Sequence, residues 1–157
     1  MAGKKIIPIA AALILIVACK NSKESPYKEN IMKFENGNIK RRYYTDAQGQ
    51  IQDTMFDYFS TGEISKIRLF KNNKQEGRST YYLKEGSLYE IQHLVDGKIE
   101  GMDSVFYPSG KIKVLAEFKD GLRNGSFKSF LEDGSVEKEY LYRNDSLLIR
   151  TDSSEVK

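Results

Sequence analysis

Apolar positions follow two different patterns along this chain. Residues 6–17 form one unbroken oily run, whereas from residue 31 onward short apolar segments alternate with turn signals about eight residues apart. Nine of the chain's twelve glycines, all of them in this second part, fall on a 24-residue period. They form three series, and we predict that all nine lie at structural turns: Gly62, Gly86, Gly110 and Gly134; Gly77, Gly101 and Gly125; and Gly97 and Gly121. Such self-similarity at a fixed period is the signature of a repeat architecture.

The side chains between the glycines keep the same register. Four residues before each glycine of the first series stands an aromatic residue, and two residues after it stands an aliphatic one. The aromatic residues, called the aromatic column below, are Tyr58, Tyr82, Phe106 and Phe130. The aliphatic residues are Ile64, Leu88, Ile112 and Val136.

The spacing predicts strands. Eight residues between turns suit a strand better than a stable helix, and Tyr, Phe, Ile and Val suit a pleated surface. Asn72-Asn73, Asp96-Gly97, Asp120-Gly121 and Asn144-Asp145 occupy the positions of primed hairpin turns. We therefore predict an all-β fold over residues 31–149, an elongated antiparallel meander or solenoid of about five 24-residue hairpins.

Alternation within the predicted strands is imperfect. In GKIKVLAEF one face is apolar, yet in GEISKIRLF both faces mix apolar and charged residues. This indicates a twisted sheet with a modest core, partly solvated on both sides. The first copy (31–61) and the last (134–149) depart from the pattern, as expected for the capping units of a solenoid.

The N-terminal segment has the features of an export signal. Lys4 and Lys5 precede the apolar run, which is shorter than the roughly 20 residues of a membrane-spanning helix and lacks the polar face of a core helix. The run ends at Cys19, the single cysteine of the chain. We predict a signal peptide at 1–18, a polar tether at 19–30 and a polar tail at 150–157.

Ile16-Val17-Ala18-Cys19 resembles the lipobox of bacterial lipoproteins. The resemblance implies cleavage before Cys19, a diacylglycerol thioether on its sulfur and usually a third acyl chain, such as palmitate, on the new amino terminus. Two or more chains anchor a protein stably to a membrane. Lys20 does not resemble an inner-membrane retention signal, which favours the outer membrane of a bacterial envelope; a plain secretory signal is the alternative.

The recurring Tyr/Phe-x-x-x-Gly-x-aliphatic motif, followed by Asp/Asn-Gly-x-x-x-Gly, resembles the bacterial variant of the membrane occupation and recognition nexus (MORN) repeat. The matching segments are 58–77, 82–101, 106–125 and a shorter one at 130–145. The resemblance implies an elongated sheet of hairpins. Many bacterial members are described as antitoxin-like and others are lipoproteins.

Charge argues against nucleic acid as a partner. The chain carries +3, and loss of Lys4 and Lys5 with the leader lowers this to +1. A surface so balanced has no electrostatic hold on a phosphate backbone.

The inventory of reactive residues is small. His93 is the single histidine, and no spacing of His, Cys or carboxylates predicts a metal or cofactor site. Asp57, Glu63, Asp103 and Glu117 are candidate catalytic carboxylates by number alone. We therefore expect no enzymatic activity, no metal and no cofactor.

The aromatic column is the candidate binding surface. Its rings either pack one hairpin against the next or form an exposed surface that binds a partner. The tyrosines that flank the column are Tyr43, Tyr44, Tyr81, Tyr89 and Tyr107. The predicted function is an envelope lipoprotein that binds a protein partner through a non-enzymatic β-repeat surface, with an antitoxin or immunity role as one form of it. The alternative is a structural or glycan-contacting component of the envelope.

Overall fold

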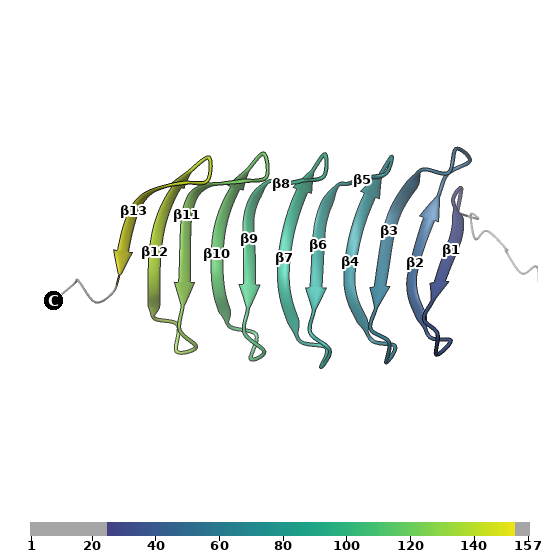
Figure 1. The fold of residues 1–157 in the computed structure, drawn as a ribbon, viewed down its shortest axis with the longest axis horizontal. Coiled ribbons are helices and arrows are strands. Elements are labelled where there is room, and N and C mark those ends of the chain that lie inside the picture. The colour runs from purple at the N-terminus through teal and green to yellow at the C-terminus, as the bar shows by residue number, and fades with distance from the viewer. Residues whose placement is uncertain (1–24, 153–157) are drawn as a thin grey trace, which may run out of the picture.

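A computed structural model describes residues 25–152, and all of its regular structure is β. Its strands form one open, antiparallel sheet in which each hairpin lies beside the next along the ribbon (Figure 1). The predicted all-β meander is therefore confirmed. No helix in the described part is long and apolar enough to span a membrane.

Eleven strands follow one another along the sheet, and two very short ones branch from it. The first half of the sheet comprises β1 Lys28–Lys33, β2 Ile39–Thr45, β3 Ile51–Tyr58, β4 Ile64–Lys71, β6 Gly77–Tyr82 and β7 Leu88–Val95. The second half comprises β9 Gly101–Phe106, β10 Ile112–Lys119, β11 Leu122–Phe130, β12 Val136–Arg143 and β13 Ser146–Asp152. The short strands are β5 Lys74–Gln75, paired with β4, and β8 Lys98–Ile99, paired with β7.

The ends of the sheet differ from the expected boundaries. β1 begins at Lys28, so the sheet starts inside the segment assigned to the tether at 19–30. β13 runs to Asp152, inside the expected tail at 150–157. The predicted signal peptide and Cys19 lie outside the described residues.

One edge of the sheet, the lower edge in Figure 1, carries five turns of a single design. In each, the first residue donates its N–H to the carbonyl four residues on, and a glycine donates back to the first residue, as Phe59 and Gly62 do at 2.8 and 3.0 Å. This is a type I turn closed by a left-handed glycine. Gly37, Gly62, Gly86, Gly110 and Gly134 hold that place, each with positive φ.

The opposite, upper edge begins with one turn of the same design, closed by Gly49, and then carries four two-residue turns. Both central residues have positive φ in Asn72-Asn73, Asp96-Gly97, Asp120-Gly121 and Asn144-Asp145. These are the dihedral signs of the type I′ turn, whose twist matches that of the flanking strands.

A bulge near the upper edge accounts for the remaining glycines. On β7, Leu94 pairs with Ile99 and Ile91 pairs with Ser104. Between these two pairs, the segment around Gly101 is two residues longer than the segment of β7 that faces it. Gly77 begins β6 at the equivalent place and Gly125 lies within β11. These three glycines were predicted to lie at turns, but they lie at the bulge: Gly77 and Gly101 begin a strand, and Gly125 lies inside β11.

The first and last copies depart from this bulge in different ways. Asp53 stands where the later copies have glycine, and its φ of 63° is positive all the same. In the last copy, Ile149 occupies the position of this glycine. Tyr142 pairs with Leu147 and Leu141 pairs with Ile149, so β13 is longer than the facing part of β12 by one residue only. The hairpin of Asp53 keeps the full gain of two residues, because Tyr44 pairs with Gln52 but Arg42 pairs with Phe56. The bulge is therefore reduced in the last copy alone, and the final hairpin still forms.

Neighbouring hairpins are joined at the upper edge by a repeated hydrogen bond. Each turn donates a backbone N–H to a carbonyl of the hairpin before it: Asn73 to Ile51, Gly97 to Gln75, Gly121 to Ile99 and Asp145 to Arg123, all at 2.9–3.0 Å. Side chains reinforce these bonds, because Glu76 accepts from the N–H of Asp96 and Glu100 from that of Asp120, each at 2.8 Å. The upper edge therefore works as a nearest-neighbour coupling of the kind that stabilises solenoids.

The core of this single-layer sheet is small. Among the described residues, the buried hydrophobic side chains are Met55, Leu94 and Ala116. Gln52, Asp57, Ser79, Thr80 and Asp103 are buried as well. Polar groups therefore share the interior with apolar ones, as the imperfect alternation indicated.

Candidate binding surface

The aromatic column lies at the lower ends of four strands. Tyr58, Tyr82, Phe106 and Phe130 are the last residues of β3, β6, β9 and β11, and all four are half-buried. Each pairs across its own hairpin with the aliphatic residue of the motif, as Tyr58 does with Ile64 and Phe106 with Ile112. Each ring thus lies opposite the aliphatic side chain that the 24-residue pattern had associated with it.

Tyr82 lines the largest of the grooves described here, with a volume of about 560 Å³. Its apolar wall comprises Phe59, Tyr81, Tyr82, Leu83 and Tyr89, and its polar rim comprises Ser65, Lys66, Lys84 and Glu90. Lys66 Nζ lies 5.5 Å from the centre of the Tyr81 ring, a cation–π distance. This aromatic groove offers flat apolar surface bordered by both signs of charge.

Phe130 lines a second groove, of about 460 Å³, over β9 to β12. Its wall includes the exposed Met102 and Val136 together with Leu115. Glu117 and Lys128 border it. Two members of the aromatic column therefore line open apolar depressions.

The flanking tyrosines serve different purposes. Tyr89 is exposed and Tyr81 half-buried, and both lie in the aromatic groove. Tyr107 instead donates its hydroxyl to the backbone carbonyl of Phe130, 2.8 Å away in the next hairpin. Tyr43 and Tyr44 lie on β2. The Tyr44 hydroxyl is 3.4 Å from Glu29, and burial raises the pKa of Tyr44.

One row of residues crosses the middle of the sheet, and we call it the central row. Its members form one cross-strand pair in each of four hairpins, 24 residues apart: Met55 with Arg68, Ser79 with Gln92, Asp103 with Ala116, and Phe127 with Tyr140. The backbone repeats at this row, yet all eight side chains differ in type.

Charged side chains surround the N-terminal part of the central row. Asp57, a neighbour of Met55 on β3, receives Arg41 Nε at 2.6 Å and also pairs with the Arg68 guanidinium. Asp57 is buried and Arg68 largely so. The carboxylate therefore links three strands through charge-assisted hydrogen bonds.

The middle of the central row brings two carboxyl groups together. Gln92 Nε2 donates to Glu90 at 2.8 Å and to Asp103 at 3.3 Å. Burial raises the pKa of Asp103, and burial together with the nearby Asp103 charge raises that of Glu90. Burial and the neighbouring carboxyl group thus make ionisation of both groups together unfavourable.

The C-terminal part of the central row is aromatic. Phe127 lies 5.8 Å from Tyr140 and 6.2 Å from Tyr142, between ring centres, and the two tyrosines lie 6.3 Å apart in an edge-to-face arrangement. The Arg123 guanidinium covers Tyr142 at 4.3 Å and is held by Asp145. Sequence periodicity did not predict this cluster, because its rings lie outside the aromatic column.

The candidate catalytic residues are dispersed. Asp57 is held by two arginines, Glu63 lies in a lower turn, and Glu117 lies beside Gly125, where a Cβ would meet its carboxylate at 1.9 Å. Asp103 is close to Glu90, which the sequence had not indicated as a candidate. His93 is exposed on β7 opposite Arg78.

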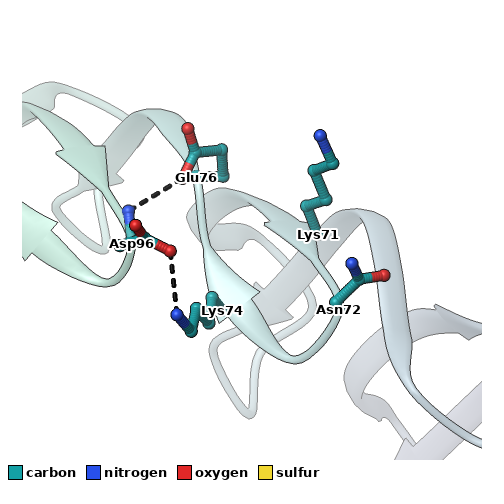
Figure 2. Close-up of a pocket in the computed structure, with 5 residues that line it drawn as sticks. All are labelled: Lys71, Asn72, Lys74, Glu76 and Asp96. Atoms are coloured by element: carbon teal, nitrogen blue, oxygen red, sulfur yellow. Dashed lines mark hydrogen bonds and ion pairs between the residues drawn. The ribbon is translucent and has the colours of Figure 1, made fainter.

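Two further features of the surface concern metal ligands and a polar depression. Among residues 25–152, no three His, Cys, Asp or Glu side chains gather as a metal site would require. The polar depression of Figure 2 lies between two upper turns, where Lys74 pairs with Asp96 at 2.9 Å and Glu76 accepts from the Asp96 N–H. This depression is a joint between hairpins.

Comparison with known proteins supports the repeat. A family model described as MORN repeat variant matches residues 104–120 and 123–144, which include most of β9 to β12. No curated protein matches the chain.

Among solved structures, the chain is similar to one entitled "Crystal Structure of TarM", with 16% identity over 80% of this chain. The matched part is 21% of that chain, so this protein spans about a fifth of its length. The TM-score of 0.31 is too low to support any argument about function.

Proposed function

We propose that this chain is a non-enzymatic binding module, held at a bacterial envelope by lipid on Cys19, that receives a protein partner in its aromatic groove. The observation that carries the proposal is the groove itself, where four rings and Leu83 line about 560 Å³ of open surface. Aromatic residues are enriched where proteins bind one another. The matched MORN repeat variant supports a β-repeat binding module.

The chemistry of the groove favours a protein over other partners. Its rim carries Lys66, Lys84 and Glu90, so both signs of charge are present and a polyanion gains little. A partner that offers an apolar side chain flanked by acidic and basic groups complements both wall and rim. An immunity-type or antitoxin-like role in the envelope is one form of this activity.

The test uses the soluble Lys20–Lys157 fragment as bait in envelope extracts. A specific protein should co-purify with the parent fragment and be lost at least tenfold with Tyr82→Ala/Tyr89→Ala. Leu131→Ala is the matched control, because Leu131 is exposed in a lower turn and does not line the groove. Equal recovery with all three baits would exclude the aromatic groove as the binding site.

A glycan partner is the alternative, supported by the same flat rings. Binding of the fragment to purified cell wall, lost with the Tyr82→Ala/Tyr89→Ala variant, would favour it over a protein. Retention of wall binding by that variant would remove this alternative for the groove.

The anchor has its own experiment. The Cys19→Ser chain should remain unprocessed, and its soluble form should leave the membrane fraction. Processing and fractionation identical to those of the parent chain would disprove lipidation at Cys19.

A further inference from the structure

The two ends of the sheet differ in the way they meet solvent. β1 exposes Ile31 and Met32, at 47% and 45%, but flanks them with Lys28, Glu29 and Lys33, the charged residues that natural sheets place on an open edge. β13 carries three consecutive apolar residues, Leu147, Leu148 and Ile149, which are 51%, 46% and 55% exposed. The capping unit expected at the C-terminal end therefore lacks the polar outer surface of a cap.

The last hairpin also concentrates exposed apolar surface around this edge. Of the fifteen large hydrophobic residues that are exposed in the described part, six lie between residues 131 and 149. Leu141 and Ile149 line one depression of about 210 Å³ that reaches the open strand. Apolar surface gathered on one edge in this way marks an interaction site.

The hydrogen-bond series of the upper edge is closed at one end and open at the other. Gly49, in the first upper turn, donates its N–H to Asp46 within the same turn. At the other end the next acceptor of the series is the backbone carbonyl of Leu147, which receives no turn N–H from the described residues. The C-terminal edge thus has the form of a sheet that another strand continues.

Strand direction identifies the occupant. The continuous sheet holds eleven strands, an odd number, so β1 and β13 point the same way (Figure 1). If two copies stacked head to tail, β13 of one copy would lie beside β1 of the next and parallel to it. All the other strand pairs of the sheet are antiparallel. A twofold axis makes the contact antiparallel, and it brings together two identical surfaces of balanced charge.

We propose that the β13 edge binds β13 of a second copy of this chain, antiparallel, across a twofold axis at Ile149. Ile149 is the middle residue of the seven in β13, so this axis overlaps the whole strand. The sheet then continues from one copy into the other, and the apolar residues of both last hairpins are partly covered. The proposal is independent of the partner in the aromatic groove.

Disulfide trapping of the full-length chain, purified in mild detergent, tests the axis. Ile149 faces its own copy across the axis, at a Cα separation of about 4.5–5.5 Å that a disulfide spans. Leu147 is just as exposed, but it lies four residues from its own copy along the paired strands, roughly 13 Å away. Ile149→Cys should therefore form a covalent dimer at least tenfold more readily than Leu147→Cys.

Two controls and two contrary results complete the experiment. Ile31→Cys on β1 measures random collision, and the parent chain measures any contribution from Cys19. Equal trapping at residues 147, 149 and 31 would overturn the proposal. In a mixture of Ile149→Cys and Ile31→Cys chains, a covalent heterodimer that forms more readily than the Ile149→Cys homodimer would overturn it in favour of head-to-tail stacking.

A second measurement covers failure of the thiols to react. The full-length chain should have the mass of a dimer by light scattering, and Ile149→Lys should have that of a monomer with an unchanged β-sheet circular dichroism spectrum. A monomeric parent chain, or a dimer unaffected by Ile149→Lys, would overturn the proposal.

Discussion

The two halves of the central row have the same backbone and opposite chemistry. In the N-terminal half, Asp57 joins Arg41 and Arg68 by ion pairs, whereas in the C-terminal half Phe127, Tyr140 and Tyr142 pack ring to ring. The turns and upper-edge hydrogen bonds that frame both halves are repeated almost unchanged. The edges thus specify the fold, and the middle of the strands is free to vary.

The largest effect we expect is in the charged half. Asp57→Ala leaves two arginines without their shared carboxylate and should lower the free energy of unfolding by about 3 kcal/mol, measured by urea denaturation. Asp96→Asn is the control, because Asn keeps the tolerance of positive φ at this turn position while the exposed pair with Lys74 loses its charge, and it should cost under about 0.5 kcal/mol. Equal costs would mean that burial of Asp57 contributes nothing.

The aromatic half should respond somewhat less. Phe127→Ala removes a half-buried ring and two ring contacts, which should cost about 2 kcal/mol. Leu131→Ala, exposed in the adjoining turn, should cost under about 0.5 kcal/mol. If the two variants unfold at the same urea concentration, the cluster is not a stabilising element.

The bulge between these regions offers a sharper comparison. Gly125→Ala and Gly134→Ala both force a side chain into positive φ, at about 1 kcal/mol each. At Gly125 the new Cβ also meets Glu117 Cβ at 2.9 Å, whereas at Gly134 no atom lies within 4 Å. Gly125→Ala should therefore cost about 1 kcal/mol more in total; an equal cost would show that the bulge relaxes freely.

The smallest effect should be a gain. Asp103→Asn removes one of two like charges and should stabilise the protein by about 0.5–1 kcal/mol at pH 7. Folding raises the pKa values of Asp103 and Glu90. The two groups therefore favour the folded state of the parent chain at a pH below the pKa of a free carboxyl group, and this contribution is lost as the pH rises through their pKa values in the folded state. The advantage of Asp103→Asn should therefore fade on acidification; a gain that is the same at every pH would contradict repulsion between the two ionised carboxyl groups.

The turns could be predicted because they depend on local backbone chemistry. Glycine, Asn and Asp tolerate positive φ, so their recurrence at 24 residues located both edges of the sheet before any tertiary contact was known. The strands followed from the distance between turns.

The central row could not be predicted, because it depends on the bulge. A plain hairpin closed at Asp96-Gly97 would place Glu90 opposite Asp103, whereas the two extra residues shift Glu90 opposite Val105 and bring Asp103 against Gln92. The positive φ of Asp53, at a position where later copies have glycine, was equally invisible in composition. The exposed β13 edge was missed because degeneracy of the last copy was interpreted as capping.

The odd number of strands has a consequence for how such a chain can lengthen. Duplication or loss of one 24-residue unit changes the strand count by two, so the terminal strands keep their common direction whatever the number of units. At about 4.8 Å per strand, each unit would move the far end by roughly 10 Å without altering either end. Ancestral genes could thus have adjusted reach by recombination alone, while the surfaces at the two extremities stayed the same.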